Sequence, residues 1–270
     1  NDHRNKETIM ILPEIDPIAL QIGPLAIRWY SLTWMAAFFG IYSLAKYRLK
    51  TYTLDQLGDL MFYGLMGAML GGRAGYCFFY GLDQLIDDPL WLFRVWEGGL
   101  SFHGGLLGVI TSVYLLSRSW EVQFFEVLDF IAPSVPVGLG TVRIGNFLNS
   151  ELLGRPTDQS WGVIFPSDPL GLLRHPSQLY QAFAEGIVLL LFLLWVSKKP
   201  KPTMAISAYF LIGYGLLRTI TEMYREPDSH IGFDAFDILT RGQLLSILMM
   251  LIGIILLIFS YYNRQHERIS

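Results

Sequence analysis

The chain has 270 residues, of which 52% are hydrophobic and 16% are charged, and its formal net charge is −3. With a mean hydropathy of +0.39, this composition favours a polytopic membrane protein over a soluble domain and offers no basic surface for nucleic acid. The single cysteine, Cys77, excludes an intramolecular disulfide or a multi-cysteine metal site. We expect one transmembrane domain over residues 10–270, after a polar stretch at 1–9 that is a cloning remnant.

The expected fold is all-α, with about seven transmembrane helices and a polar outer loop region. A helix needs about 20 mostly apolar residues to cross a bilayer. The fourth segment is the weakest, because Pro133 and Pro136 would break or kink a helix, so it could form two short pieces. In chain order, the seven segments are roughly 29–46, 57–80, 100–117, 126–143, 179–197, 203–222 and 242–262.

The basic residues predict the orientation of these segments. With an odd number of spans the termini lie on opposite sides of the membrane, and every lysine except Lys6 then falls on the side of the C-terminus. The positive-inside rule places that side in the cytoplasm and the N-terminus outside. The outer loops, which hold most of the acidic residues, are expected near 81–99, 144–178 and 223–241.

This topology brings five polar side chains from five helices to one depth, near the outer leaflet. An arginine at the centre of a bilayer costs about 2.5–3.5 kcal/mol, so each arginine there needs a polar partner or a ligand. The pattern predicts a single pocket at the outer leaflet, with an anionic lipid head group as the obvious ligand. The five residues are Tyr30, Arg73, His103, Arg143 and Arg218.

Tyr214, Arg218 and Glu222 recur every four residues, which stacks them on one helix face. Glu222 can hold Arg218 in place for an anion, or it can simply neutralise Arg218 as a structural pair. Arg143 has the same two interpretations with Glu151. Two arginines at one depth favour phosphate, because a planar guanidinium fork suits it well.

His103 lies between glycines, which let another backbone or a ligand approach closely. It is either a hydrogen-bonded structural group or a base, since a neutral imidazole with a pKa near 6.5 is a competent base at neutral pH. Asn146 and Asn149 can donate to a phosphate oxygen or cap the end of the fourth span. Arg73, surrounded by glycines that suggest close helix packing, is interpreted as structural or secondary.

These residues fall in motifs that resemble the bacterial prolipoprotein diacylglyceryl transferase family, commonly called Lgt. The family signature has the form G-R-x-[GA]-N-F-x-N-x-E-x-x-G, and this chain reads RIGNFLNSELLG after Val142, which replaces the first glycine. The segment between Phe165 and Arg174 is shorter than in some relatives. Five other stretches match in chain order, namely IGPLAIRWYSL, GGRAGY, LFRVWEGGLSFHGGLLG, RHPSQLYQ and GYGLLRTITEMYREPD.

The resemblance implies transfer of the diacylglyceryl group of phosphatidylglycerol to the lipobox cysteine of a preprolipoprotein, with glycerol phosphate leaving. It implies a bacterial cytoplasmic (inner) membrane enzyme that acts at the outer leaflet, with phosphatidylglycerol, lipobox signal peptides and membrane lipids as partners and with no cofactor or metal. The family's functional positions fall on Tyr30, His103, Arg143, Asn146, Glu151, Gly154, Tyr214, Arg218 and Glu222.

The expected catalytic residues are His103 as base, Arg143 and Arg218 on the phosphate, and Tyr30, which with Asn146 orients substrate oxygens. The expected substrate-binding residues are Asn146, Glu151, Gly154, Tyr214, Glu222 and Arg73. Two alternatives remain open, a lipid or anion transporter that uses the arginines as a transit site and a membrane scaffold without catalysis. The sequence has no convincing internal repeat for the first and no HExxH motif for a metalloprotease.

Overall fold

The computed structural model describes residues 10–23, 25–227, 233–235 and 239–267. The chain divides into two compact units. The first unit consists of Asn1–Ile41 and Ile131–Ser270, and the second is Tyr42–Phe130. The expectation of a single transmembrane domain stays a prediction.

The first unit opens with short strands that the sequence did not predict. Strands β2 (Ile18–Ile22) and β3 (Leu25–Arg28) form an antiparallel hairpin that leads directly into helix α1 (Trp29–Tyr47). Strand β1 (Met10–Ile11) pairs in parallel with β4 (Val163–Ile164), which pairs antiparallel with β5 (Leu173–Arg174). The loop before and after β4 is thereby tied to the start of the chain.

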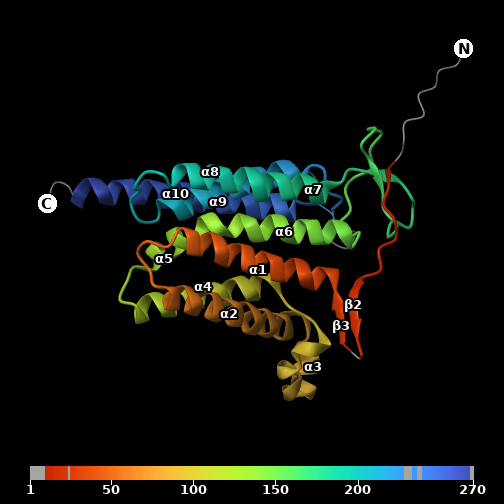
Figure 1. The fold of residues 1–270 in the computed structure, drawn as a ribbon, viewed down its shortest axis with the longest axis horizontal. Coiled ribbons are helices and arrows are strands. Elements are labelled where there is room, and N and C mark those ends of the chain that lie inside the picture. The colour runs from red at the N-terminus through yellow and green to blue at the C-terminus, as the bar shows by residue number, and fades with distance from the viewer. Residues whose placement is uncertain (1–9, 24, 228–232, 236–238, 268–270) are drawn as a thin grey trace, which may run out of the picture. The chain divides into compact units, whose positions relative to one another are not determined.

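Long helices follow in the first unit and run side by side (Figure 1). Their close packing depends on small residues: a Cβ on Gly140 of α6 would lie 3.0 Å from the Cα of Gly186. The helices are α6 (Val135–Leu148), α7 (Ser177–Gln181), the π-helical η4 (Ala182–Val188), α8 (Leu189–Val196), α9 (Ala205–Glu222) and α10 (Arg241–Glu267). Strands β6 (Phe233–Ala235) and β7 (Leu239–Thr240) pair just before α10.

The second unit is built on helices α2 (Leu54–Tyr80) and α4 (Phe102–Ser119). A Cβ on Gly108 would overlap the backbone of Gly67, and a Cβ on Gly71 or Gly75 would overlap the backbone of Gly104, so the two helices touch through their glycines. The contacts of Gly71 and Gly75 confirm the prediction of close helix packing around Arg73. Between the two helices lie the short helices α3 (Leu82–Asp87), η1 (Pro89–Phe93) and η2 (Val95–Glu97).

The fourth predicted segment is interrupted, as its two prolines suggest. Helix α5 (Phe124–Ile131) is followed by one 3-10 turn, η3 (Ala132–Ser134), before α6 begins at Val135. Pro133 and Pro136 both stand at the first positions of a helix, where the missing N–H costs little. The chain therefore continues as a helix with a change of geometry.

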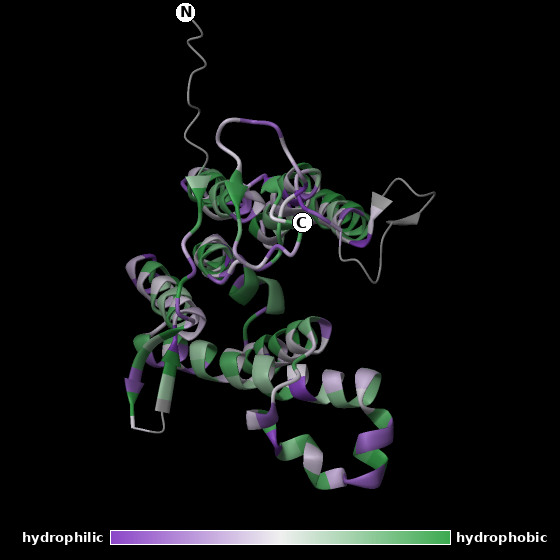
Figure 2. Cartoon of the chain, turned by 90° about the vertical axis from the view of Figure 1, so that its right-hand side faces the viewer, coloured by the Kyte–Doolittle hydropathy of each residue, from purple (hydrophilic) through white to green (hydrophobic). Residues whose placement is uncertain are grey.

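Each of the seven predicted segments contains helix, and hydrophobic residues cover most of the long helices (Figure 2). Within the described part of the chain, three helices have both the length and the apolar composition to cross a membrane. They are Phe124–Leu148, Ser177–Val196 and Arg241–Gln265. The chain is thus a mostly helical membrane protein, and the count of seven spans stays a prediction.

Candidate functional site

Two arginines from different helices share one buried carboxylate in the first unit. The Nε of Arg143 on α6 lies 3.7 Å from Oε2 of Glu185. The Nη1 of Arg218 on α9 lies 3.4 Å from Oε1 of Glu185. The side chain of Glu185 has no exposed surface, whereas those of Arg143 and Arg218 are 17% and 10% exposed. The carboxylate therefore supports the pair from behind, and the guanidinium groups keep some access to a ligand.

The predicted pair of Arg218 and Glu222 is present on one face of α9. Their Nη2 and Oε2 atoms lie 2.7 Å apart, and Oε1 of Glu222 is 3.7 Å from Nη1 of Arg225. The Thr240 hydroxyl donates to Oε1 of Glu222 at 3.4 Å. Tyr214, one turn before Arg218, interacts with Arg143, so the predicted Tyr214–Arg218–Glu222 row does gather at the arginine pair.

Glu151 does not form the direct ion pair with Arg143 that the sequence suggested. Arg143 instead donates to Oδ1 of Asn146 at 3.5 Å, and the Nδ2 of Asn146 donates to Oε2 of Glu151 at 3.2 Å. Glu151 lies beyond the end of α6, one connection further from the guanidinium, while Glu185 on the neighbouring helix lies alongside it. Asn146 is 4% exposed and thus links the arginine pair to Glu151.

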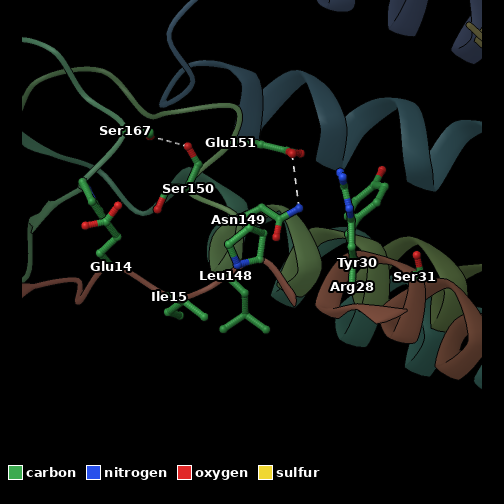
Figure 3. A pocket seen from close by; sticks show the side chains of 12 residues that line it. Glu14, Ile15, Arg28, Tyr30, Ser31, Leu148, Asn149, Ser150, Glu151 and Ser167 are labelled. Carbon is green, nitrogen blue, oxygen red and sulfur yellow. Dashed lines mark hydrogen bonds between the residues drawn. The ribbon is translucent and has the colours of Figure 1, made fainter. Parts of the chain in front are cut away.

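Glu151 also lines a cavity of about 410 Å³ at the end of α6. Tyr30 lies in its wall, next to Arg28 and close to the Asn149–Glu151 pair, whose hydrogen bond is 3.2 Å long (Figure 3). A Cβ on Gly145 would meet the side chain of Thr33, so the first turns of α1 are packed against α6. This packing brings Tyr30 to the same wall as Glu151.

Two residues of this wall region have strained backbones. Ser150 and Leu152 have φ values of 55° and 54°, a left-handed conformation that side chains rarely adopt. The Ser167 hydroxyl donates to the Ser150 carbonyl at 2.5 Å, and the Gln178 amide donates to the Glu151 carbonyl at 2.5 Å. Such strain persists only where surrounding contacts enforce it, and it is found often at functional sites.

Gly154 fills a position where no larger residue fits, because a Cβ there would overlap the carbonyl of His175. Its own carbonyl accepts a hydrogen bond of 3.0 Å from Nη1 of Arg174. Arg174 also forms a bidentate pair with Asp168, at 2.7 and 3.0 Å, and these hydrogen bonds hold the pKa of the Asp168 carboxyl below its usual value. Burial lowers the pKa of the neighbouring His175.

His103 and Arg73 belong to the second unit, whereas the arginine pair belongs to the first. His103 is exposed in the first turn of α4, which begins after the N-cap Ser101. Arg73 is 2% exposed, donates to the carbonyls of Trp91, Leu92, Gly98 and Gly99, and lies 4.6 Å over the Trp91 ring. Backbone carbonyls thus accept the hydrogen bonds of the Arg73 guanidinium, which favours the structural interpretation.

The sequence did not predict a role for Glu185, Thr221, Gln178 or Arg225. Glu185 had a usable signal, since it is the one charged residue in an apolar run and a charge at membrane depth indicates a functional site. The π-helical turn that carries it leaves no such signal in the sequence. Among the described residues, no three His, Cys, Asp or Glu side chains gather as a metal site would require.

Comparison with known proteins gives consistent matches. A model of the prolipoprotein diacylglyceryl transferase family matches residues 17–259. The phosphatidylglycerol–prolipoprotein diacylglyceryl transferase of Acinetobacter baylyi is 47% identical over 265 residues, which cover 96% of this chain and 97% of that protein. The protein of the same name from Teredinibacter turnerae is 50% identical over 263 residues, 92% of each chain. The chain therefore belongs to the prolipoprotein diacylglyceryl transferase family.

Proposed function

We propose that the protein transfers the diacylglyceryl group of phosphatidylglycerol to the thiol of a lipobox cysteine in a preprolipoprotein. The observation that carries this proposal is the Arg143–Glu185–Arg218 arrangement, in which two partly accessible guanidinium groups from separate helices are held by one buried carboxylate. Relatives at 47–50% identity bear the name of this activity. A phosphate bound to both arginines would be the natural occupant.

The reaction explains why two arginines serve here. The thiol sulfur attacks the glyceryl carbon, the S–C bond forms, and the C–O bond to phosphate breaks with its electron pair going to the phosphate oxygen. The phosphate thereby changes from a diester with one negative charge toward a monoester with two. Since its charge grows in the transition state, the arginines stabilise that state more than the bound lipid.

The thiol proton requires an acceptor, because a cysteine with a pKa of about 8.5 is mostly protonated at neutral pH. We assign this role to His103. A general base typically raises the reaction rate about 10²–10⁴-fold. Tyr30 and Asn146 orient substrate oxygens beside the arginine pair. If His103→Gln retained near-normal turnover while phosphatidylglycerol still bound, the base would have to be another group.

The proposed enzyme crosses the bacterial cytoplasmic membrane seven times, with its N-terminus outside and its C-terminus in the cytoplasm. The supporting feature is the distribution of lysines, all but one of which fall on the C-terminal side of that topology. Arg143, Asn146, Arg218 and Tyr30 then lie toward the outer leaflet, where the lipobox of an exported preprolipoprotein also arrives.

The direct test incubates purified full-length protein with phosphatidylglycerol labelled in its glyceryl group and a lipobox peptide. A transferase yields a peptide heavier by one diacylglyceryl group, together with glycerol phosphate. A peptide variant with serine in place of cysteine is the control and should remain unmodified. Movement of lipid without peptide modification would instead indicate a transporter. If the protein neither modified the peptide nor moved lipid, it would be a scaffold.

A further inference from the structure

Glu185 is completely buried, and its two oxygens face two different arginines. Oε1 lies 3.4 Å from Arg218 and accepts a hydrogen bond of 3.0 Å from the Thr221 hydroxyl. Oε2 lies 3.7 Å from Arg143 and has no hydrogen-bond partner among the described residues. One carboxylate is therefore shared by the pair, held firmly on the side of α9 and loosely on the side of α6.

The local backbone delivers Glu185 to this position. The π-helical segment η4 carries it, and such segments are found often at functional sites because the wide turn redirects a side chain. Gly186 packs directly against Gly140, three residues before Arg143 on α6. A carboxylate next to this contact can reach between α6 and α9.

Stability alone gives a poor reason for a charge at this depth. Removing a carboxylate from water costs several kcal/mol, and a buried ion pair is often no more stabilising than apolar residues of similar volume. The ion pairs of the site connect three arginines, Arg143, Arg218 and Arg225, with two glutamates, Glu185 and Glu222. Within this group Glu185 is the carboxylate that both Arg143 and Arg218 contact, so it lowers the positive charge that these two arginines present to a ligand.

We propose that Glu185 is a positioning residue that aligns Arg143 and Arg218 and lowers the positive charge that they present to the phosphate. This inference rests on the proposed transferase function. A carboxylate beside the two guanidinium groups weakens their attraction for an anion, and it does so more for the dianionic product than for the monoanionic lipid substrate. Glu185 thereby speeds the release of glycerol phosphate after transfer.

The test compares two soluble probes that differ in charge, binding to full-length protein in phosphatidylcholine nanodiscs at pH 8. Glycerol phosphate is a dianion there, since the second pKa of a phosphate monoester is about 6, and glycerophosphoglycerol is a monoanion. Glu185→Gln should bind glycerol phosphate about tenfold more tightly, which corresponds to about 1.4 kcal/mol, and should gain less for glycerophosphoglycerol. It should also show a lower kcat, because product leaves more slowly.

Two variants serve as controls. Glu185→Asp keeps the charge, and Glu97→Gln removes a partly exposed carboxylate that pairs with Arg94 in the second unit. Both should keep the wild-type ratio of the two affinities. Unchanged or weaker glycerol phosphate binding by Glu185→Gln, in an enzyme whose wild type binds and transfers normally, would overturn the role of Glu185. Failure of the wild type itself to bind either probe or to transfer would instead reject the proposed function.

A second pair of variants tests the positioning role even if Glu185→Gln does not fold. Thr221→Val removes the hydroxyl that donates to Glu185, whereas Thr221→Ser keeps it. We expect Thr221→Val to lower kcat about tenfold with an unchanged unfolding temperature and Thr221→Ser to restore it. Equal kcat values in the wild type and both variants would contradict the positioning role.

Discussion

At the scale of single residues, the arginine pair differs from the other buried arginines of the chain in what surrounds it. Arg73 donates to four backbone carbonyls and Arg174 to Asp168, so the protein itself satisfies both. Arg143 and Arg218 share Glu185 at 3.7 and 3.4 Å, and although Arg218 also pairs with Glu222 at 2.7 Å, the two side chains keep 17% and 10% exposure. This difference separates structural arginines from those of the site.

Replacing Arg218 tests whether the guanidinium fork itself is needed. We expect Arg218→Ala to reduce kcat/KM for phosphatidylglycerol at least about 100-fold, the scale of losing one charged transition-state contact. Arg218→Lys keeps the charge but loses the bidentate geometry, so its kcat/KM should lie between the values of the wild type and Arg218→Ala. Arg118→Ala, on an exposed residue of α4, is the matched control with wild-type turnover. Wild-type kcat/KM in Arg218→Ala would exclude the phosphate role.

At the scale of elements, the sequence predicted the long helices well because an apolar stretch of about 20 residues is a strong signal. Helix α9 ends at Glu222, as predicted, and α2 begins three residues before the predicted start. The β2–β3 hairpin and the π-helical η4 were not predicted, since pairing between short strands and a widened helical turn depend on tertiary contacts. Glu185 was missed together with the turn that carries it.

Helices α2 and α4 should tolerate substitution differently at two glycines. A Cβ on Gly108 would overlap the backbone of Gly67, whereas Gly64 has no heavy atom within 4 Å of its Cβ position. We expect Gly108→Ala to lower the free energy of unfolding by about 1–3 kcal/mol, the usual cost of overpacking. Gly64→Ala should leave it unchanged or slightly raised. Equal unfolding temperatures in detergent for the two variants would contradict the described contact.

The stability of the loop that contains Gly154 should depend on pH, because Arg174 connects this loop to the ionised carboxylate of Asp168. The pKa of Asp168 in the folded protein lies below its unfolded value of about 3.9. Its contribution to stability is therefore complete above that value and is lost as the pH falls through the folded pKa. Asp168→Asn should lower the unfolding temperature at pH 7, and its difference from wild type should shrink below about pH 4. A difference that is constant over that range would argue against the ion pair.

At the scale of the whole molecule, the proposed orientation can be measured with single cysteines. Once Cys77 is replaced by serine, the chain has no other cysteine. Gln159→Cys, exposed in the loop after α6, should react with a membrane-impermeant maleimide in spheroplasts. Lys199→Cys, exposed between α8 and α9, should react only after the membrane is opened. The reverse labelling pattern would place the arginine site toward the cytoplasmic leaflet and contradict the proposed orientation.

The sequence pointed to Arg143, Asn146 and Arg218 of the candidate site, because arginines and amides are costly within apolar helices and therefore informative. Arg218 with Glu222 was predicted from a spacing of four, which a single helix determines. Glu151 was the wrong direct partner for Arg143, because that contact depends on which neighbouring helix packs against α6. The spacing within one helix predicted a specific ion pair, whereas the choice of partner on a neighbouring helix could not be predicted.

An experimental structure of the full-length protein with bound phosphatidylglycerol would test the role of the arginine pair most directly. We predict that the lipid phosphate lies within hydrogen-bond distance of the guanidinium groups of both Arg143 and Arg218, with Glu185 on the far side of the pair. A phosphate bound elsewhere, with the two arginines satisfied only by Glu185 and Glu222, would contradict it.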